Sequence, residues 1–455
     1  MKNINDLTDG SIWKKLIIYF LPIAAGTLLQ QLYNTVDAVI VGKYVGTEAL
    51  AAVGGSPAQL SNLLIGFFTS LAAGAAVVIA QHYGAKNYRR VSQEVYTSIT
   101  FCTLVGILLG LIVIASAPTL LKVMQTPEDT FDMATTYTRI YFCGTLFILI
   151  YNMASGILRA VGDSRTPFVL LIVSCLLNIA LDLIFILKYD LGVAGAAWAT
   201  VIAQGVSAVA AVVILFLSKE ECIRIRKFKI RWDILGNMLR IGVPAGVQSA
   251  MYGLSNLILQ IGVNTLGTVV VASWSMSGKI DGLYWATSSA FGTAVTNFVG
   301  QNYGAARMDR IKQCVKTSTK LFAGITLALS AIILIIAQPL LTVFSDDPAV
   351  RETTWHIITY FVPFYLFWTI IEVFSGVLRG VGDAIKPMII IALSVCVLRL
   401  VWECSAFMIW HTLPVLSACY PISWAVADVA LLWYYFRGSM FKTEHPWFRI
   451  RKWEK

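Results

Sequence analysis

Charged side chains are scarce in this sequence. Of its 455 residues, 13% are Asp, Glu, Lys or Arg, 57% are hydrophobic, and the mean hydropathy is +0.73. A soluble domain carries about 25% charged residues, so this composition excludes an ordinary soluble protein and predicts an all-α integral membrane protein. The net charge of +10 does not indicate a nucleic-acid partner, because the basic residues gather between apolar runs, as they do in cytoplasmic loops.

The side chains that most often carry catalysis or bind metals are also few. The four His residues are scattered, and none accompanies a nucleophile motif, so we expect no enzymatic activity. The eight Cys residues fall mostly within apolar runs and lack the spacing of a metal site. We therefore predict no disulfide, no zinc site and no bound cofactor.

Long apolar runs dominate the chain instead. A helix needs about 20 residues to cross a bilayer, and twelve runs exceed that length, so each is predicted to be one transmembrane helix. The runs are Trp13–Val41, Leu50–Ala80, Gln93–Ala115, Met133–Ala160, Thr166–Leu187, Gly192–Leu217, Asn237–Val263, Thr268–Val299, Gln313–Gln338, Thr353–Gly380, Pro387–Trp410 and Pro414–Phe436.

The distribution of basic residues supports this count. If the N-terminus is placed inside and the runs alternate, 28 of the 35 Lys and Arg residues fall on the inner side and five on the outer side. Arg159 and Arg379 are counted here as inner loop charges. Cytoplasmic loops carry such an excess of Lys and Arg, so we predict a multi-pass protein of the cell (cytoplasmic) membrane with both termini in the cytoplasm.

The chain also contains an internal repeat. VIAQHYGAKNYRRV (78–91) matches FVGQNYGAARMDRI (298–311), and SGILRAVGDSRTP (155–167) matches SGVLRGVGDAIKP (375–387), both at an offset of 220 residues. Two matches at one offset indicate duplication, and two six-helix lobes that both begin inside form a parallel repeat. The predicted division is an N-terminal lobe at 1–217, a cytoplasmic linker at 218–236, a C-terminal lobe at 237–436 and a cytoplasmic tail at 437–455.

Polar side chains interrupt the first apolar run on one face. Gln30, Asn34 and Asp37 are spaced three or four residues apart, so they share one side of the predicted helix. An Asp in hydrocarbon costs about 2.5–3.5 kcal/mol on insertion scales, and such residues face a bundle interior or a water-filled cavity. Asp37 is therefore a candidate functional residue.

Two further runs carry polar pairs at a similar depth. Asn178 and Asp182 are i and i+4 in one run, and Thr200 and Gln204 are i and i+4 in the next. At a rise of about 1.5 Å per residue, Asp37, Asp182, Asn178 and Thr200 lie roughly 6–14 Å below the outer surface. Their oxygens suit Na⁺, and two carboxylates in a low-dielectric pocket can instead share a proton. We predict a Na⁺ or H⁺ site at Asp37, Asn178, Asp182 and Thr200, supported by Gln30, Asn34 and Gln204.

A different explanation for these residues is a structural hydrogen-bond network that binds no cation. The C-terminal half lacks a matching acid pair but has buried charges of its own. Among these, Arg399 is expected to pair with Asp281 or Glu403, because the first pair falls at one depth and the second is i, i+4. The candidate substrate-cavity residues are Asp281, Glu372, Glu403, Tyr33 and Tyr284.

Four segments resemble the MATE family of multidrug and toxic compound extrusion transporters, within a wider superfamily of multidrug, oligosaccharidyl-lipid and polysaccharide flippases. They are LYNTVDAVIVG (32–42), QHYGAKN (81–87), SGILRAVGDSRTP (155–167) and NIALDLIFI (178–186), and the resemblance extends over essentially the whole chain. It implies an antiporter that couples inward Na⁺ or H⁺ movement to efflux of cationic, amphipathic compounds by alternating access. It also implies a cation site at Asp37, Asn178, Asp182 and Thr200.

The sequence leaves a second function open. A flippase for a lipid-linked oligosaccharide or a related envelope precursor would share the twelve-helix layout, but it needs a strongly cationic cavity. The bases expected to be buried are Lys279 and Arg399, which are outnumbered by six buried acids, so the antiporter is the preferred hypothesis. For either function we expect a monomer in the lipid bilayer that acts on small molecules.

Overall fold

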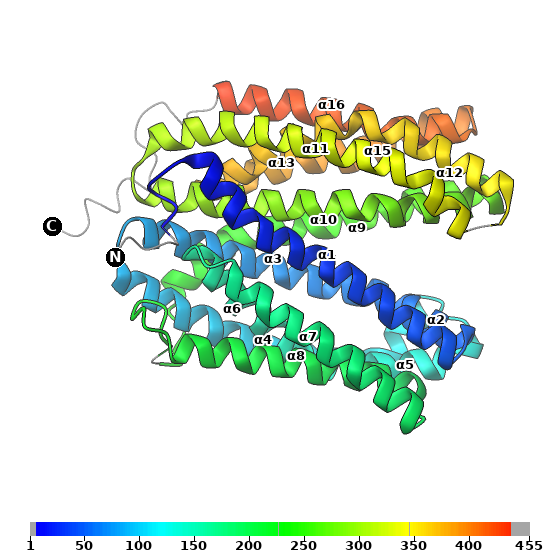
Figure 1. Ribbon diagram of the computed structural model, residues 1–455, viewed down its shortest axis with the longest axis horizontal. Coiled ribbons are helices and arrows are strands. Elements are labelled where there is room, and N and C mark those ends of the chain that lie inside the picture. Colours follow the sequence, from blue (N-terminus) through cyan, green and yellow to red (C-terminus); the bar gives the residue numbers. More distant parts are fainter. Residues whose placement is uncertain (1–5, 226, 345, 438–455) are drawn as a thin grey trace.

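Helices form all of the regular structure in the described chain, as the composition predicts. The computed structural model describes residues 6–437, apart from 226 and 345 (Figure 1). The predicted C-terminal tail, 437–455, lies outside the described residues except for Arg437.

The helices form two bundles that lie one above the other in Figure 1. The N-terminal lobe contains α1 (Ile12–Tyr44), α2 (Thr47–Gly54), α3 (Ser56–Gly84), α4 (Tyr88–Val123), α5 (Glu128–Cys143), α6 (Thr145–Ala160), α7 (Arg165–Leu183), the π-helical turn η1 (Ile184–Lys188) and α8 (Gly192–Phe216). The C-terminal lobe contains α9 (Trp232–Thr265), α10 (Thr268–Gly304), α11 (Met308–Phe344), α12 (Pro348–Phe361), the 3₁₀ turn η2 (Val362–Phe364), α13 (Tyr365–Gly380), α14 (Ile385–Ile391), the π-helical turn η3 (Ala392–Val397), α15 (Leu398–Trp402), the π-helical turn η4 (Glu403–Phe407) and α16 (Leu413–Arg437).

Joined end to end, these helices make twelve spans, six in each lobe. Nine helices of the described chain are long and apolar enough to cross a membrane, and the pair α5–α6, which bends by 45°, makes a tenth. The other two are α9 with 34 residues and α10 with 37, which are more polar but long enough to span. The predicted fold class is confirmed, although several predicted spans are broken or contain π turns.

The repeated motifs have the same backbone conformation in both lobes. Gly162 and Gly382 have φ values of 96° and 94°, and Lys86 and Ala306 have φ values of 58° and 56°. The left-handed conformation is unfavourable for a residue with a Cβ, so chance would rarely place it at two equivalent positions of the repeat, Lys86 and Ala306. The matched geometry confirms that the two lobes are copies of one structural unit.

The lobes touch at one end of the molecule. We call this the linker end, because the segment between α8 and α9 lies there, where α1 also begins and α16 ends (Figure 1). The Gln81 side chain donates through Nε2 to the Gly380 carbonyl at 2.8 Å, and its repeat counterpart Gln301 donates to the Ala160 carbonyl at 2.7 Å. All four residues are buried, so these hydrogen bonds join the lobes without intervening water.

Two glycines make this approach possible. A Cβ on Gly84 would lie 1.9 Å from the Gln301 carbonyl oxygen, and a Cβ on Gly304 would lie 1.7 Å from the Gln81 carbonyl oxygen. Nearer the middle of the spans, a Cβ on Gly74 would lie 2.4 Å from the Gly242 backbone. The lobes are therefore in backbone contact from the linker end toward the molecular centre.

Candidate functional site

The fold brings two carboxyl groups together inside the N-terminal lobe. Asp37 on α1 and Asp182 on α7 lie close enough for their side chains to interact directly, and Asp182 is fully buried. Within the described chain, neither acid forms a salt bridge. Two desolvated carboxylates without a base repel each other, so the pair requires a cation or a proton.

Asn178 and Thr200 are next to one another in the same lobe. Asn178 donates through Nδ2 to the Thr200 hydroxyl oxygen at 3.3 Å, and that hydroxyl donates to the Ala196 carbonyl at 3.1 Å. One oxygen of Asp37, both oxygens of Asp182 and the amide oxygen of Asn178 are buried without a hydrogen-bond donor among the described residues. Buried acceptors are normally paired, so these four oxygens are available to a cation.

The donor set suits a monovalent ion or a proton. Nowhere in the described part of the chain do three His, Cys, Asp or Glu side chains gather as they do in a metal centre. Oxygen ligands without imidazole or thiolate are typical of Na⁺, Mg²⁺ and Ca²⁺ rather than of transition metals. Two carboxylates with neutral amide and hydroxyl oxygens can be neutralised by one Na⁺ and one proton, or by protons alone.

Three tyrosines surround the acid pair. Tyr33 on α1 contacts the Thr200 hydroxyl and, with Tyr137 and Tyr141 on α5, lies within electrostatic range of Asp37. The rings of Tyr137 and Tyr141 stack with centroids 5.7 Å apart. Tyr137 and Tyr141 were not predicted as part of the site, although their i, i+4 spacing places them on one face of their predicted span.

A cavity of about 400 Å³ lies beside the acid pair in the N-terminal lobe. Gln30 and Asn34 face this cavity from α1, and Gln204 faces it from α8, so the predicted supporting residues share one wall. Tyr33 and Thr200 also line it, whereas Asp37 and Asp182 do not. The acids therefore lie behind the wall of this cavity, next to Tyr33 and Thr200.

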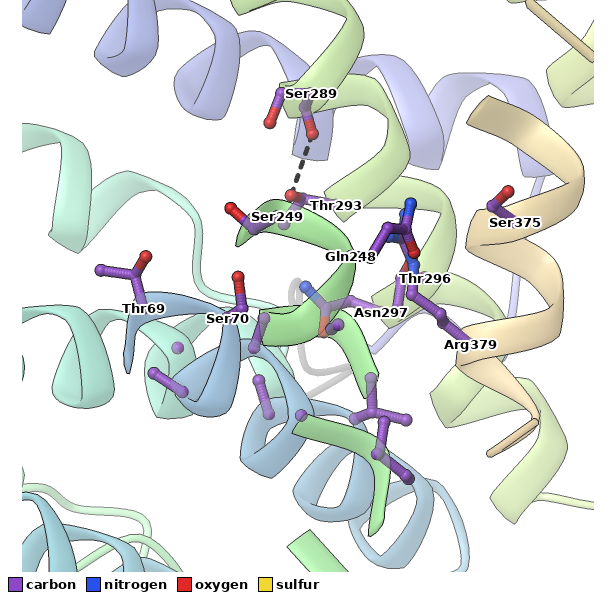
Figure 2. Close-up of a pocket in the computed structure, with 18 of the residues that line it drawn as sticks. Thr69, Ser70, Gln248, Ser249, Ser289, Thr293, Thr296, Asn297, Ser375 and Arg379 are labelled. Carbon is purple, nitrogen blue, oxygen red and sulfur yellow. Dashed lines mark hydrogen bonds between the residues drawn. The ribbon is translucent and has the colours of Figure 1, made fainter. Parts of the chain in front are cut away.

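A second cavity, of about 440 Å³, lies between the lobes, and we call it the central cavity. Figure 2 shows part of its lining: hydroxyl and amide side chains that come from α3, α9, α10 and α13, together with Arg379. Glu372 and Arg159 also line it. Both cavities include Thr69, Asn152 and Arg159, so they adjoin one another.

The structure separates the predicted substrate-cavity residues. Glu372 lines the central cavity and Tyr33 lines the N-lobe cavity. Asp281 is buried and accepts a hydrogen bond from the Tyr365 hydroxyl, while Tyr284 is fully buried and stacks on Tyr365 at a centroid distance of 4.1 Å. Glu403, also buried, packs against Gly262 of α9 and lines neither cavity.

The pairing expected for Arg399 does not form. Its Nε donates to the Ser423 hydroxyl at 3.2 Å, and its guanidinium lies 4.0 Å from the ring centroid of Tyr420, both on α16. Asp281 is bound to Tyr365 instead. Glu403 begins the π-helical turn η4, and the wider turn changes the i, i+4 register on which the other pairing depended.

Known proteins match most of this chain in sequence. The MatE family model matches residues 22–184 and 244–403, one segment in each lobe. The "Probable multidrug resistance protein YoeA" of Bacillus subtilis is 30% identical over 93% of this chain and 94% of that protein. The "Multidrug export protein MepA" of Staphylococcus aureus is 24% identical over 82% of each chain.

Solved structures agree in fold. A MOP superfamily transporter from Pyrococcus furiosus superposes with a TM-score of 0.89 at 24% identity, covering 97% of this chain and 99% of that one. A multidrug resistance MATE family transporter in an outward-facing conformation also superposes with a TM-score of 0.89, at 23% identity, covering 98% and 99%. The arrangement of all twelve spans is therefore shared with these structures.

Proposed function

Since this chain belongs to the MATE family of transporters, we propose that it is a secondary active exporter that couples inward movement of Na⁺ or H⁺ to efflux of small molecules. The observation that carries this proposal is the acid pair of Asp37 and Asp182, which has no base beside it in the described chain and three of whose four oxygens are buried without a hydrogen-bond donor. Two similar proteins are named as multidrug resistance or multidrug export proteins, which favours drug-like substrates.

Cation binding would allow α1 and α7, which carry Asp37 and Asp182, to come closer together. When the pair is empty, two carboxylates repel across a site that has little water, and a bound cation removes that repulsion. One charge that crosses the full membrane potential gains about 2.3 kcal/mol per 100 mV. This is enough to change the balance between two conformations about 50-fold, since each 1.4 kcal/mol is a factor of ten.

We further propose that the linker end faces the cytoplasm and that the central cavity opens outward in this conformation. The basic linker and the lobe contacts lie at the same end. Under the positive-inside rule that end is cytoplasmic. Alternating access would then consist of separating these contacts while the lobes close at the opposite end.

Glu372 is the acid that the central cavity offers to a cationic group on the substrate. It is not free, because its Oε1 lies 3.7 Å from Nη2 of Arg379. A substrate cation would therefore compete with Arg379 for the carboxylate. The acids Asp281 and Glu403 could contribute only if the C-terminal lobe rearranged, since both are buried in its interior here.

A lipid-precursor flippase is the second candidate, and the arginines of the central cavity are what favour it. A pyrophosphate head group needs cationic partners, and Arg159 and Arg379 both line the cavity. A flippase for an envelope precursor predicts that deletion of the gene impairs envelope synthesis and leaves drug sensitivity unchanged. An exporter predicts the reverse.

The decisive experiment is efflux of ethidium from proteoliposomes under an imposed Na⁺ gradient or an imposed pH gradient, applied separately. One gradient should drive efflux, and Asp37→Asn should abolish it while the protein remains folded in the membrane. Asp132→Asn is the matched control, because Asp132 is an exposed acid of α5 outside both cavities. Wild-type efflux by the Asp37→Asn variant would refute the proposed role of the acid pair.

A further inference from the structure

Two arginines, one from each repeat, line the central cavity. Arg159 lies in the last turn of α6 and Arg379 in the last turn of α13, at the repeat offset of 220 residues. Both side chains are partly buried in the wall of the cavity, close to the linker end where the lobes meet. Two guanidinium groups therefore border one cavity, and each is supplied by a different lobe.

Both guanidinium groups have N–H donors that no described residue engages. Each carries five N–H donors. Nη2 of Arg379 is 3.7 Å from Oε1 of Glu372, which is too long for a hydrogen bond. Arg159 accepts a hydrogen bond from the Tyr19 hydroxyl through its main-chain carbonyl, which leaves its side chain unengaged. Among the residues that the structure describes, neither guanidinium therefore donates a hydrogen bond.

The charge of the cavity is unbalanced. Its charged lining consists of Arg159, Arg379 and Glu372, and the other polar side chains are neutral amides and hydroxyls. The carboxylate of Glu372 on α13 packs against Gly292 of α10, where a Cβ would collide with it. The one acid of the lining therefore lies beside Arg379, and the cavity keeps an excess of positive charge near Arg159.

A purely structural role explains less. A basic residue in the last turn of a helix is stabilised by the helix dipole, and Lys or Arg near the cytoplasmic face is ordinary in a membrane protein. Either role would be met by a side chain at the molecular surface. Arg159 and Arg379 instead border a space of about 440 Å³ in which amide and hydroxyl groups accompany them.

We propose that Arg159 and Arg379 form an oxyanion-binding seat in the central cavity, which favours substrates that carry a carboxylate or phosphate group. Guanidinium binds both groups with paired, charge-assisted hydrogen bonds. The proposal rests on the proposed transport function and names a feature of its substrates.

The test is binding of two dyes that differ in a single group. Rhodamine B has a free carboxylate, and in its ethyl ester that carboxylate is blocked. Fluorescence anisotropy with the purified full-length protein should show rhodamine B binding about tenfold more tightly than the ester, as expected for one charge-assisted hydrogen-bonded pair. Equal affinities for the two dyes in the wild-type protein would overturn the proposal without the need for any variant.

Variants then locate the seat. Arg159→Gln and Arg379→Gln should each reduce the preference for rhodamine B several-fold and leave ester binding unchanged, which also reports that the cavity is intact. Arg379→Lys should keep part of the preference, because the positive charge remains. Arg307→Gln is the control, since Arg307 is an exposed arginine outside the cavity. An undiminished preference in the Arg159→Gln/Arg379→Gln double variant would also overturn the proposal.

The oxyanion that binds here can belong to a lipid head group or to the transported substrate, and a lipid titration distinguishes the two. Phosphatidylglycerol is added to nanodiscs of phosphatidylcholine that contain the protein with bound rhodamine B. Displacement of the dye would assign the seat to a lipid phosphate, and retention of the dye would assign it to the substrate. Binding is measured without any gradient. Failure of gradient-driven efflux therefore leaves this result intact, and equal dye affinities leave the exporter proposal intact.

Discussion

A single methyl group at Gly304 should prevent the lobes from meeting at the linker end. In Gly304→Ala the new Cβ would lie 1.7 Å from the Gln81 carbonyl oxygen. Carbon and oxygen atoms in contact are usually about 3.3–3.6 Å apart, so the two backbones must part by roughly 1.5 Å. Such a shift breaks the hydrogen bonds from Gln81 to Gly380 and from Gln301 to Ala160, which are 2.8 Å and 2.7 Å long.

The magnitude follows from those two bonds. Each contributes about 0.5–1.5 kcal/mol net, so their loss disfavours this conformation by about 1–3 kcal/mol. That corresponds to a population change of about 5- to 150-fold toward the state with the linker end open. The double electron–electron resonance distance between spin labels at Arg89 and Gln313, which are exposed on opposite lobes, should lengthen in the variant.

The control is Gly324→Ala on α11, where a Cβ would have no neighbour within 4 Å. It makes the same chemical change in the same lobe without touching the other lobe. Labelling requires replacement of Cys143 and Cys404, the exposed cysteines of the described chain. A distance distribution in Gly304→Ala that matches the wild type would show that backbone contact does not hold this end closed.

Two further substitutions test the interior of each lobe. Thr200→Val should remove the acceptor for the Asn178 amide at 3.3 Å, at a cost of about 1–3 kcal/mol for a buried unsatisfied donor, and should raise the cation concentration needed for half-maximal efflux. Tyr365→Phe should leave Asp281 without its donor and lower the thermal midpoint of unfolding by several degrees, while the direction of the driving gradient stays the same. Efflux with an unchanged cation dependence would contradict the first, and an unchanged midpoint would contradict the second.

Much of the architecture could be predicted from the sequence, because it depends on the length of the apolar runs and on the internal repeat. The bilayer sets the length of each apolar run, and the repeat offset of 220 residues recurs in the φ values of Gly162 and Gly382. The proximity of Asp37 to Asp182 followed from depth and helix face, since each residue advances a helix by a fixed rise. Whether a cation binds there stays a prediction.

Other features depend on irregular helical turns and on packing between the lobes, neither of which can be read from the spacing of residues in the sequence. The π-helical turns in residues 392–397 and 403–407 alter which side chains share a face, so the expected pairing of Arg399 with Glu403 was wrong. Arg159 and Arg379 were counted as loop charges because they lie at the ends of apolar runs. Whether such a residue faces the bulk or a cavity depends on the packing of the opposite lobe.

Helix α1 is the element through which the acid pair can act on the linker end. Asp37 lies in its C-terminal part, and near its other end the Tyr19 hydroxyl donates to the Arg159 carbonyl at 2.6 Å. These two residues are about 27 Å apart along a continuous helix. Phe20 also packs edge-on against Phe291 of α10, with centroids 5.3 Å apart, so α1 touches the C-terminal lobe as well. A displacement of α1 at Asp37 would therefore be transmitted to both lobes beside the proposed oxyanion seat, which is what exchange of a cation for a substrate requires.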